Sequence, residues 1–397
     1  GIERTVVVVS SKSGTTVETR SHLAACEHAF AEAGIPAADR IVIVTDPGSE
    51  LEQLARTAGY RVFLADPEVG GRFSVFTAFG LVPATLAGAD TRALLDQASA
   101  VRPALSADDA ANPAIRLAAA VCSGSPQRFV LPIVEAADAQ WGLGDWIEQL
   151  VAESTGKDGT GMLPVALLPE APEQHEPLPA NCRLVRLREA AGTEPLADEL
   201  EVAGPLGAQF FLWEAATALM GHLLGIDPFN QPDVESAKIA ARRVLAESPL
   251  VTGHAAPRHS PAELITALRR AVDPNGYVVI QAFLDRVPGT EAVLEEFRTD
   301  LVRALNVPVA VGFGPRYLHS TGQFHKGGPA VGAFLQLLDT TMPEVPIPGT
   351  DGTFGSLILA QASGDREVLA SHGRPVLFCA TEDLPATLRQ MREALAN

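Results

Sequence analysis

The sequence has few basic residues and no long apolar run, and each shortage excludes a class of protein. Thirty Lys and Arg residues stand against 48 Asp and Glu residues, which gives a formal net charge of -18 at pH 7. Nucleic acids and anionic membranes bind proteins through basic stripes, and none is visible here, so we expect neither as a partner. No stretch of about 18 uninterrupted apolar residues occurs, which argues against a transmembrane helix. These observations favour a cytoplasmic protein.

Cysteine and histidine are also too scattered to suggest a metal centre. The cysteines, Cys26, Cys122, Cys182 and Cys379, form no C-x-x-C pair, so we expect reduced core residues rather than disulfides or metal ligands. The histidines form no H-x-x-x-H or H-E-x-x-H pattern, which argues against a zinc site. The sequence contains no G-x-G-x-x-G or P-loop motif either, so we expect no nucleotide cofactor.

A loop rich in hydroxyl side chains follows the first apolar run. The strand expected at residues 6–9 leads into Ser11, Lys12, Ser13, Gly14, Thr15 and Thr16, and a helix is expected to follow. Small residues let backbone N–H groups converge on one point, and the positive end of a helix favours an anion. The pattern therefore suggests a phosphate site. The alternative is an ordinary strand-to-helix turn with a Thr cap.

Strands and helices are expected to alternate along the whole chain, which indicates an α/β fold with parallel sheets. Three regions are expected, at residues 1–105, 106–250 and 251–397. The expected strands lie at 6–9, 41–45, 62–64, 129–134, 165–168, 183–187, 277–283, 307–312, 356–360 and 376–380. The expected helices lie at 18–33, 50–58, 73–88, 144–154, 209–224, 233–246, 291–305 and 384–395, and the helix at 73–88 is expected to be buried because it is apolar almost all round.

Four segments resemble, in the same order, motifs of the glucose-6-phosphate isomerases of the sugar isomerase (SIS) superfamily. They are SKSGTTVET at residues 11–19, GGRFSVFTAFGL at 70–81, QLVAESTGK at 149–157 and DPFNQPDVESAK at 227–238. The resemblance implies two SIS-type lobes, each with a parallel sheet flanked by helices, followed by a C-terminal α/β region. It also implies interconversion of glucose 6-phosphate and fructose 6-phosphate through a cis-enediol, without a cofactor or metal.

The resemblance assigns a role to individual residues. Glu153 would move the proton between C1 and C2, and Arg72 would hold the enediolate, a task that suits a permanently charged guanidinium. Ser11, Lys12, Ser13, Thr15 and Thr16 would bind phosphate, Gln149 and Gln231 would bind the sugar, and Lys238 would contact it and assist ring opening.

Helical spacing agrees with these roles but does not require them. Gln149 and Glu153 are four residues apart, and Gln231 and Lys238 seven, so each pair shares a helix face. The alternatives are a solvated Glu153, a structural Arg72, a capping Gln231 and a surface Lys238.

The histidine that would open the sugar ring is less easily assigned. His175 and His222 lie where the family carries it, but neither belongs to a recognisable motif. His319 and His325 lie in a glycine-flanked polar stretch at residues 318–329. That stretch resembles the extra C-terminal region of fused transaldolase/glucose-6-phosphate isomerases. A structural role for either histidine is the alternative.

The family motif that precedes the SKSGTT loop, a strand with a G-x-G-G-S turn, has no counterpart here, since the sequence starts at the following strand. We therefore expect a C-terminal part of a longer protein that is fused to a transaldolase, and by resemblance a homodimer. Two other functions compete with this one. They are a sugar-phosphate-binding SIS module without catalysis, and another SIS isomerase acting on mannose 6-phosphate or an amino sugar.

Overall fold

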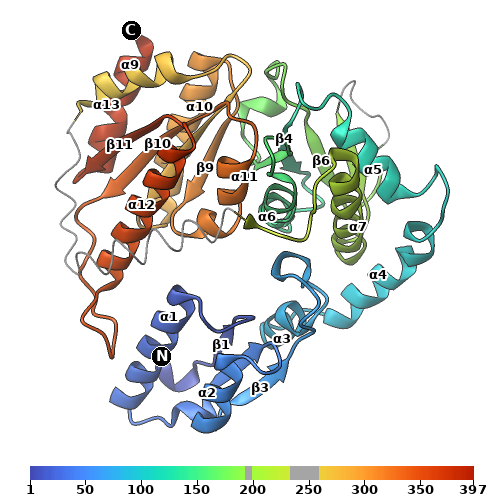
Figure 1. The fold of residues 1–397 in the computed structure, drawn as a ribbon, viewed down its shortest axis with the longest axis vertical. Coiled ribbons are helices and arrows are strands. Elements are labelled where there is room, and N and C mark those ends of the chain that lie inside the picture. Colours follow the sequence, from blue (N-terminus) through green and yellow to red (C-terminus); the bar gives the residue numbers. More distant parts are fainter. Residues whose placement is uncertain (193–198, 233–258) are drawn as a thin grey trace. The chain divides into compact units, whose positions relative to one another are not determined.

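The computed structural model describes residues 1–192, 199–232 and 259–397, which form two compact units (Figure 1). Unit 1 comprises Gly1–Ala100 together with Val345–Phe354, and unit 2 comprises Val101–Glu344 with Gly355–Asn397. Three sheets are present in the described residues, and every strand pair in them is parallel. The α/β prediction is confirmed. Among the described helices, none is both long and apolar enough to cross a membrane.

Unit 1 is built on a small sheet with the strand order β1-β2-β3. Its elements are β1 (Val7–Ser10), α1 (Val17–Glu32), β2 (Ile41–Thr45), α2 (Glu50–Ala58), β3 (Arg61–Leu64), the 3-10 helix η3 (Gly71–Phe73), α3 (Ala78–Leu86) and most of α4 (Thr91–Leu105). Leu23 and Phe30 of α1, Ile43 of β2 and Leu51 of α2 are buried together in its core. This packing fixes the loop that joins β1 to α1.

Unit 2 contains two four-stranded sheets. The first has the order β5-β4-β6-β7 and the second the order β11-β10-β8-β9. The first sheet and its neighbouring helices comprise, in chain order, α5 (Pro113–Cys122), β4 (Val130–Glu135), α6 (Leu143–Thr155), β5 (Leu163–Ala166), β6 (Val185–Arg188), β7 (Leu200–Ala203) and α7 (Leu206–Leu224). The second sheet and its neighbouring helices comprise, in chain order, α9 (Pro261–Ala271), β8 (Tyr277–Phe283), α10 (Pro288–Leu305), β9 (Val309–Phe313), η5 (Arg316–His319), α11 (Gly322–Gly327), β10 (Gly332–Asp339), α12 (Phe354–Ser371), β11 (Val376–Thr381) and α13 (Leu384–Ala396).

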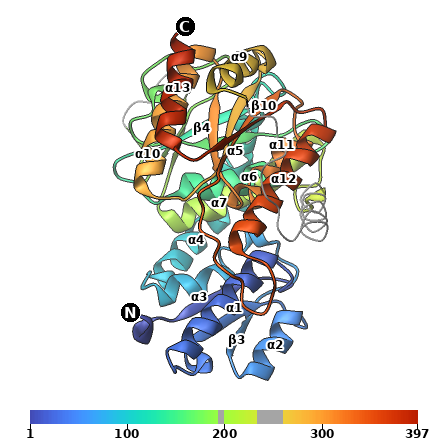
Figure 2. The same cartoon turned by 90° about the vertical axis from the view of Figure 1, so that its left-hand side faces the viewer.

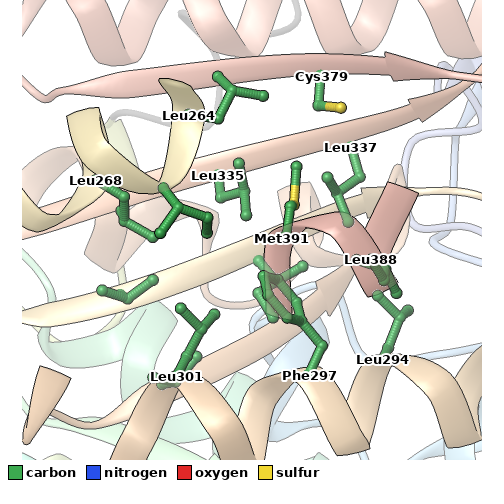
Figure 3. Close-up of a cluster of buried hydrophobic side chains, with 14 of the residues drawn as sticks. Leu264, Leu268, Leu294, Phe297, Leu301, Leu335, Leu337, Cys379, Leu388 and Met391 are labelled. Atoms are coloured by element: carbon green, nitrogen blue, oxygen red, sulfur yellow. The ribbon is translucent and has the colours of Figure 1, made fainter. Parts of the chain in front are cut away.

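Helices cover both faces of the second sheet. On one face, side chains from α9, α10 and α13 pack with those of the strands into an apolar cluster that includes Leu268, Phe297 and Met391 (Figure 3). On the other face, Tyr317 and Leu318 of η5 pack with Phe283. Figure 2 shows α10 and α13 on one side of β10, and α11 and α12 on the other. All seven residues of β8 are buried, as expected for a strand covered on both faces.

The sequence interpretation missed the central strand β10 and placed a strand at 356–360, where the structure has the start of α12. Gln336, in the middle of β10, interrupts its apolar pattern. Its amide is nevertheless buried and satisfied, because it donates to the carbonyl of Ala362 at 3.1 Å. The apolar residues at 356–360 open a helix of 18 residues, and so short an apolar run does not distinguish a strand from a helix.

The two sheets of unit 2 are joined by buried polar contacts. Arg298 of α10 donates both of its terminal nitrogens to the carboxylate of Glu173, which follows β5, and both side chains are almost fully buried. Asn181, just before β6, donates to the carbonyl of Gly276 at 2.8 Å. The predicted second lobe and C-terminal region thus lie within one compact unit. The predicted boundary at 250/251 lies outside the described residues.

The apolar cluster that α9, α10 and α13 form with the second sheet allows a prediction about stability. Replacing Phe297, which is fully buried, with Ala removes apolar contacts and leaves a cavity. Unfolding by urea should show a loss of about 3–5 kcal/mol. The control is Leu223→Ala at a side chain that is 54% exposed, where a change within about 0.5 kcal/mol is expected. Equal effects of the two substitutions would contradict the burial described here.

Candidate active site

The loop between β1 and α1 is shaped by a glycine and by its own hydroxyl groups. Gly14 has φ +75°, and a Cβ on it would lie 2.4 Å from the Cβ of Leu51, so another residue would be strained and crowded. The N–H of Gly14 donates to Oγ of Ser11 at 3.1 Å, and the hydroxyls of Ser13 and Thr15 lie 2.8 Å apart. Ser13 and Thr15 are exposed. Thr16 precedes α1 without capping it through its side chain, so the first turn of the helix follows directly on this loop.

Lys12 ties this loop to the segment that carries the second motif. Its amine forms an ion pair with Asp46 at 2.8 Å and donates to the carbonyl of Val69 at 2.9 Å. It also lies 5.6 Å from the ring centroid of Phe79. The charge of Lys12 is therefore matched by a carboxylate within unit 1. Its amine holds residues 67–69 beside the loop, which sequence reasoning did not foresee.

Arg72 lies in η3, directly after the segment that Lys12 holds. Its side chain is largely buried, with 7% of the residue exposed, and its guanidinium carbon lies 5.6 Å from the ring centroid of Phe73. Two of the four motifs are therefore adjacent within unit 1.

The proton-transfer candidate lies in the last turn of α6. Glu153 is 9% exposed, and one of its carboxylate oxygens accepts a hydrogen bond from the amide of Gln149 at 3.3 Å. The predicted helix and the shared face of this pair are confirmed by α6. Glu153 is thus not the solvated surface carboxylate of the alternative interpretation.

Two further motif segments pack against the same end of α6. Lys157 donates from its amine to the carbonyl of Asp227 in the DPFNQP segment. Gln323 of α11 donates from its amide to the carbonyl of Gly156 at 2.9 Å. Gly156 has no side chain because a Cβ there would lie 2.3 Å from the Cα of Phe324. Three segments that are distant in the sequence therefore converge within unit 2.

The two candidate histidines differ sharply in their surroundings. His325 is 1% exposed, packs among aromatic rings such as Tyr277 and Phe334, and both of its ring nitrogens have no hydrogen-bond partner in the described part of the chain. Burial, together with the charges of Lys326 and Arg374, holds the pKa of His325 well below its usual value. His319, at the end of η5, is only half-buried. Of the two, His319 has the accessible ring.

A buried polar cluster supports this histidine-bearing segment. Asp365 of α12 forms an ion pair with Lys326 at 2.5 Å and accepts a hydrogen bond from the hydroxyl of Tyr317 at 2.6 Å. The amide of Gln281 donates to the same carboxylate at 3.1 Å. Nothing in the sequence marked Asp365, since an isolated Asp within a helix gives no motif.

The remaining predicted residues fall at the edge of the described structure. Gln231 is exposed, just beyond the carbonyl that Lys157 contacts. Lys238 and the helix expected at 233–246 lie outside the described residues. In the part of the chain that is described, no group of three or more His, Cys, Asp and Glu side chains is placed to hold a metal ion.

Comparison with known proteins identifies the family. No family model matches the chain. A probable glucose-6-phosphate isomerase from Natronomonas pharaonis is 30% identical over 296 aligned residues, which cover 62% of this chain and 68% of that protein. The chain belongs to the glucose-6-phosphate isomerase family. The glucose-6-phosphate isomerase of Rubrobacter xylanophilus is 31% identical over 59% of this chain and 67% of its own length.

The fold agrees with this membership. A crystal structure of glucose-6-phosphate isomerase from Chlamydia trachomatis superposes with a TM-score of 0.52 at 17% identity, covering 64% of this chain and 61% of that structure. The predicted resemblance to glucose-6-phosphate isomerases is thus confirmed, and the chain spans about two thirds of the length of these relatives.

The close approach at Gly156 can be tested directly. Gly156→Ala should lower the free energy of unfolding by about 1–3 kcal/mol, because the Cβ meets backbone atoms that must move. The matched control is Gly289→Ala in the first turn of α10, where a Cβ meets nothing within 4 Å. Differential scanning calorimetry on both variants decides the point, since equal melting temperatures would mean that α6 and α11 are not in contact.

The buried pair of Lys326 and Asp365 predicts a non-additive response. Lys326→Met leaves an uncompensated buried carboxylate and should cost about 3–5 kcal/mol of unfolding free energy, whereas adding Asp365→Asn should restore part of that loss. Urea unfolding of the two single variants and the double variant measures the coupling. Strictly additive losses would show that the two groups do not interact.

Proposed function

We propose that this chain interconverts glucose 6-phosphate and fructose 6-phosphate by proton transfer through a cis-enediol. The observation that carries the proposal is the buried carboxylate of Glu153 in the last turn of α6, which accepts a hydrogen bond from Gln149 and lies where two other motif segments converge. Aldose–ketose isomerisation needs a base that moves one proton between neighbouring carbons, and a carboxylate held by a hydrogen bond suits that task. Membership of the glucose-6-phosphate isomerase family supports the same substrate.

Phosphate binding is assigned to the loop after β1. Ser11, Ser13, Thr15 and Thr16 supply hydroxyl donors beside the first turn of α1, whose positive end favours an anion. Lys12 contributes mainly by positioning, because Asp46 already pairs with its amine. Local donors rather than net charge must attract the substrate, since the whole chain carries -18.

The remaining steps are assigned to a donor for the oxyanion and a group for ring opening. Arg72 would stabilise the enediolate, because a guanidinium keeps its charge throughout the reaction. Gln231 and Lys238 would contact the sugar. His319 would protonate or deprotonate the ring oxygen, and we favour it over His325 because a fully buried ring cannot reach a substrate.

Assembly and context form part of the proposal. The stretch at 318–329 supports a relation to fused transaldolase/glucose-6-phosphate isomerases, and we propose that this chain is the isomerase part of such a fusion and acts as a homodimer in the cytoplasm. Sedimentation equilibrium tests the dimer. A fully active monomer would contradict it.

The decisive test compares Glu153→Gln with the unchanged protein in a dehydrogenase-coupled assay of fructose 6-phosphate. Loss of the proton-transfer group should lower kcat by about a hundredfold or more, while KM stays nearly constant. The control is Glu393→Gln, an equal change of charge at an exposed position of α13, which should keep full activity.

The same experiment separates the competing functions. A protein that binds fructose 6-phosphate but turns over no substrate would be a binding module. Faster turnover of mannose 6-phosphate than of fructose 6-phosphate would indicate another isomerase of this superfamily. Full activity in Glu153→Gln would refute the assigned base.

A further inference from the structure

A cleft of about 600 Å³ lies within unit 2, at the carboxyl ends of strands from both of its sheets. Glu135 ends β4, Ala166 ends β5 and Phe313 ends β9, and all three line the cleft. Ligands of open parallel sheets bind at this edge, where loops and helix starts supply polar groups around an apolar floor. Position and size therefore both fit a small molecule.

The cleft is separate from the proposed active site. It opens at the first turns of α6, where Gly144, Asp145 and Glu148 line it, whereas Glu153 lies in the last turn. Asp145 and Glu153 are eight residues apart, which places them about 12 Å apart along the helix axis. None of the residues assigned to phosphate, sugar or proton transfer lines this cleft.

The charged lining is acidic, with five carboxylates and two arginines. These are Glu135, Asp145, Glu148, Glu291 and Glu295 with Arg286 and Arg316. The arginines are engaged, because Arg316 pairs with Asp145 at 3.2 Å and Arg286 pairs with Glu291 at 2.7 Å. A second anion, such as a sugar phosphate, would therefore meet an excess of negative charge.

Two of the other carboxylates also have partners. Glu135 accepts hydrogen bonds from the backbone N–H groups of Gly142 and Gly144 at 2.9 and 2.8 Å. Glu295 forms an ion pair with Arg298 at 2.7 Å. Among the described residues, Glu135 and Glu148 are therefore the carboxyl groups of the lining without an ion pair, and Glu135 is already held by several backbone N–H groups, which leaves Glu148 for a cation.

Glu148 holds its proton unusually tightly. Burial, reinforced by the neighbouring carboxylate of Asp145, raises its pKa to about 8, although the N–H of Ala166 and the charge of Arg316 oppose the shift. Arg286, Glu291 and Glu295 face the same cleft from the neighbouring segments. A cation placed beside Glu148 would favour the ionised carboxylate and release the proton.

The cleft lining also contains apolar side chains. Leu167, Val311 and Phe313 line the cleft together with Leu294, and the guanidinium of Arg286 already lies 5.2 Å from the ring centroid of Phe313. The walls therefore suit a ligand that carries an apolar body as well as a positive charge.

We propose that this cleft binds a small organic amine, whose ammonium group pairs with Glu148 and whose apolar body lies against Val311 and Phe313. The site goes beyond the isomerase reaction and does not depend on it. Its ligand class follows from one available carboxyl group, a net acidic lining and an aromatic wall.

Isothermal titration calorimetry with phenethylamine at pH 7 tests the proposal. We expect binding with release of protons, seen as a heat that differs between PIPES and HEPES buffers, and an affinity that rises from pH 6 to pH 8. Phenethyl alcohol, which has the same body without the charge, should bind at least about tenfold more weakly.

Variants show whether Glu148 is responsible. Glu148→Gln should weaken phenethylamine about tenfold or more and abolish the buffer dependence, whereas Glu393→Gln, with the same change of charge on α13, should leave both unchanged. Ala292→Trp, at an exposed position of the cleft lining, should block binding by filling the space while leaving Glu148 intact.

Three results would overturn the proposal. They are no binding of phenethylamine at millimolar concentration, equal binding of the amine and the alcohol, or undiminished proton release in Glu148→Gln. Because the readout is heat and not turnover, an inactive protein would refute the proposed isomerase without affecting this result.

Discussion

One buried carboxylate, Asp365, fixes the position of the segment of unit 2 that comprises η5 and α11 and carries both candidate histidines. It holds Lys326 of α11 by charge and Tyr317 of η5, two residues before His319, by a hydrogen bond. A buried charge is costly unless it is paired and hydrogen-bonded. The arrangement of η5 and α11 is therefore strongly coupled to α12, because moving either would leave a charge in the core without its partner.

The segment fixed in this way contacts the end of α6, so the second sheet of unit 2 helps to shape the surroundings of Glu153. Gln323 and Gly327 both form hydrogen bonds with the residues that follow Glu153. In unit 1 the corresponding residue is Lys12, whose contacts with Asp46 and Val69 hold the loop after β1 beside the segment that leads to Arg72. In each unit, a lysine holds neighbouring segments in place through an ion pair with a carboxylate: Lys12 in unit 1 and Lys326 in unit 2.

Much of the fold could be predicted from the sequence because its signals were local. The helix that carries Gln149 and Glu153 was predicted within one residue at each end, and β8 was placed at its observed bounds. Four motifs identified the family. The errors arose where tertiary contacts decide the outcome. Gln336 fits a buried strand only because Ala362 accepts its hydrogen bond, and His325 is enclosed by rings from distant elements.

The candidate site was predictable in its residue types but less so in their roles. The sequence shows that Lys12 is basic, but not that Asp46 neutralises it, because the two are 34 residues apart and meet only when β1 pairs with β2. Asp365 and Glu148 carry no motif at all. Their importance comes from burial and from neighbours on other elements, which a single sequence does not reveal.

The course of the chain has a consequence for any attempt to produce the units separately. Unit 1 includes Val345–Phe354, a segment that lies far along the sequence, and the ring of Phe354 stacks on His22 of α1 at 5.3 Å. Neither unit is therefore one continuous stretch of sequence. A fragment ending near residue 100 would lack this stacking partner, and a fragment starting there would carry an orphaned piece of the other unit, so the two must be synthesised as one polypeptide to be complete.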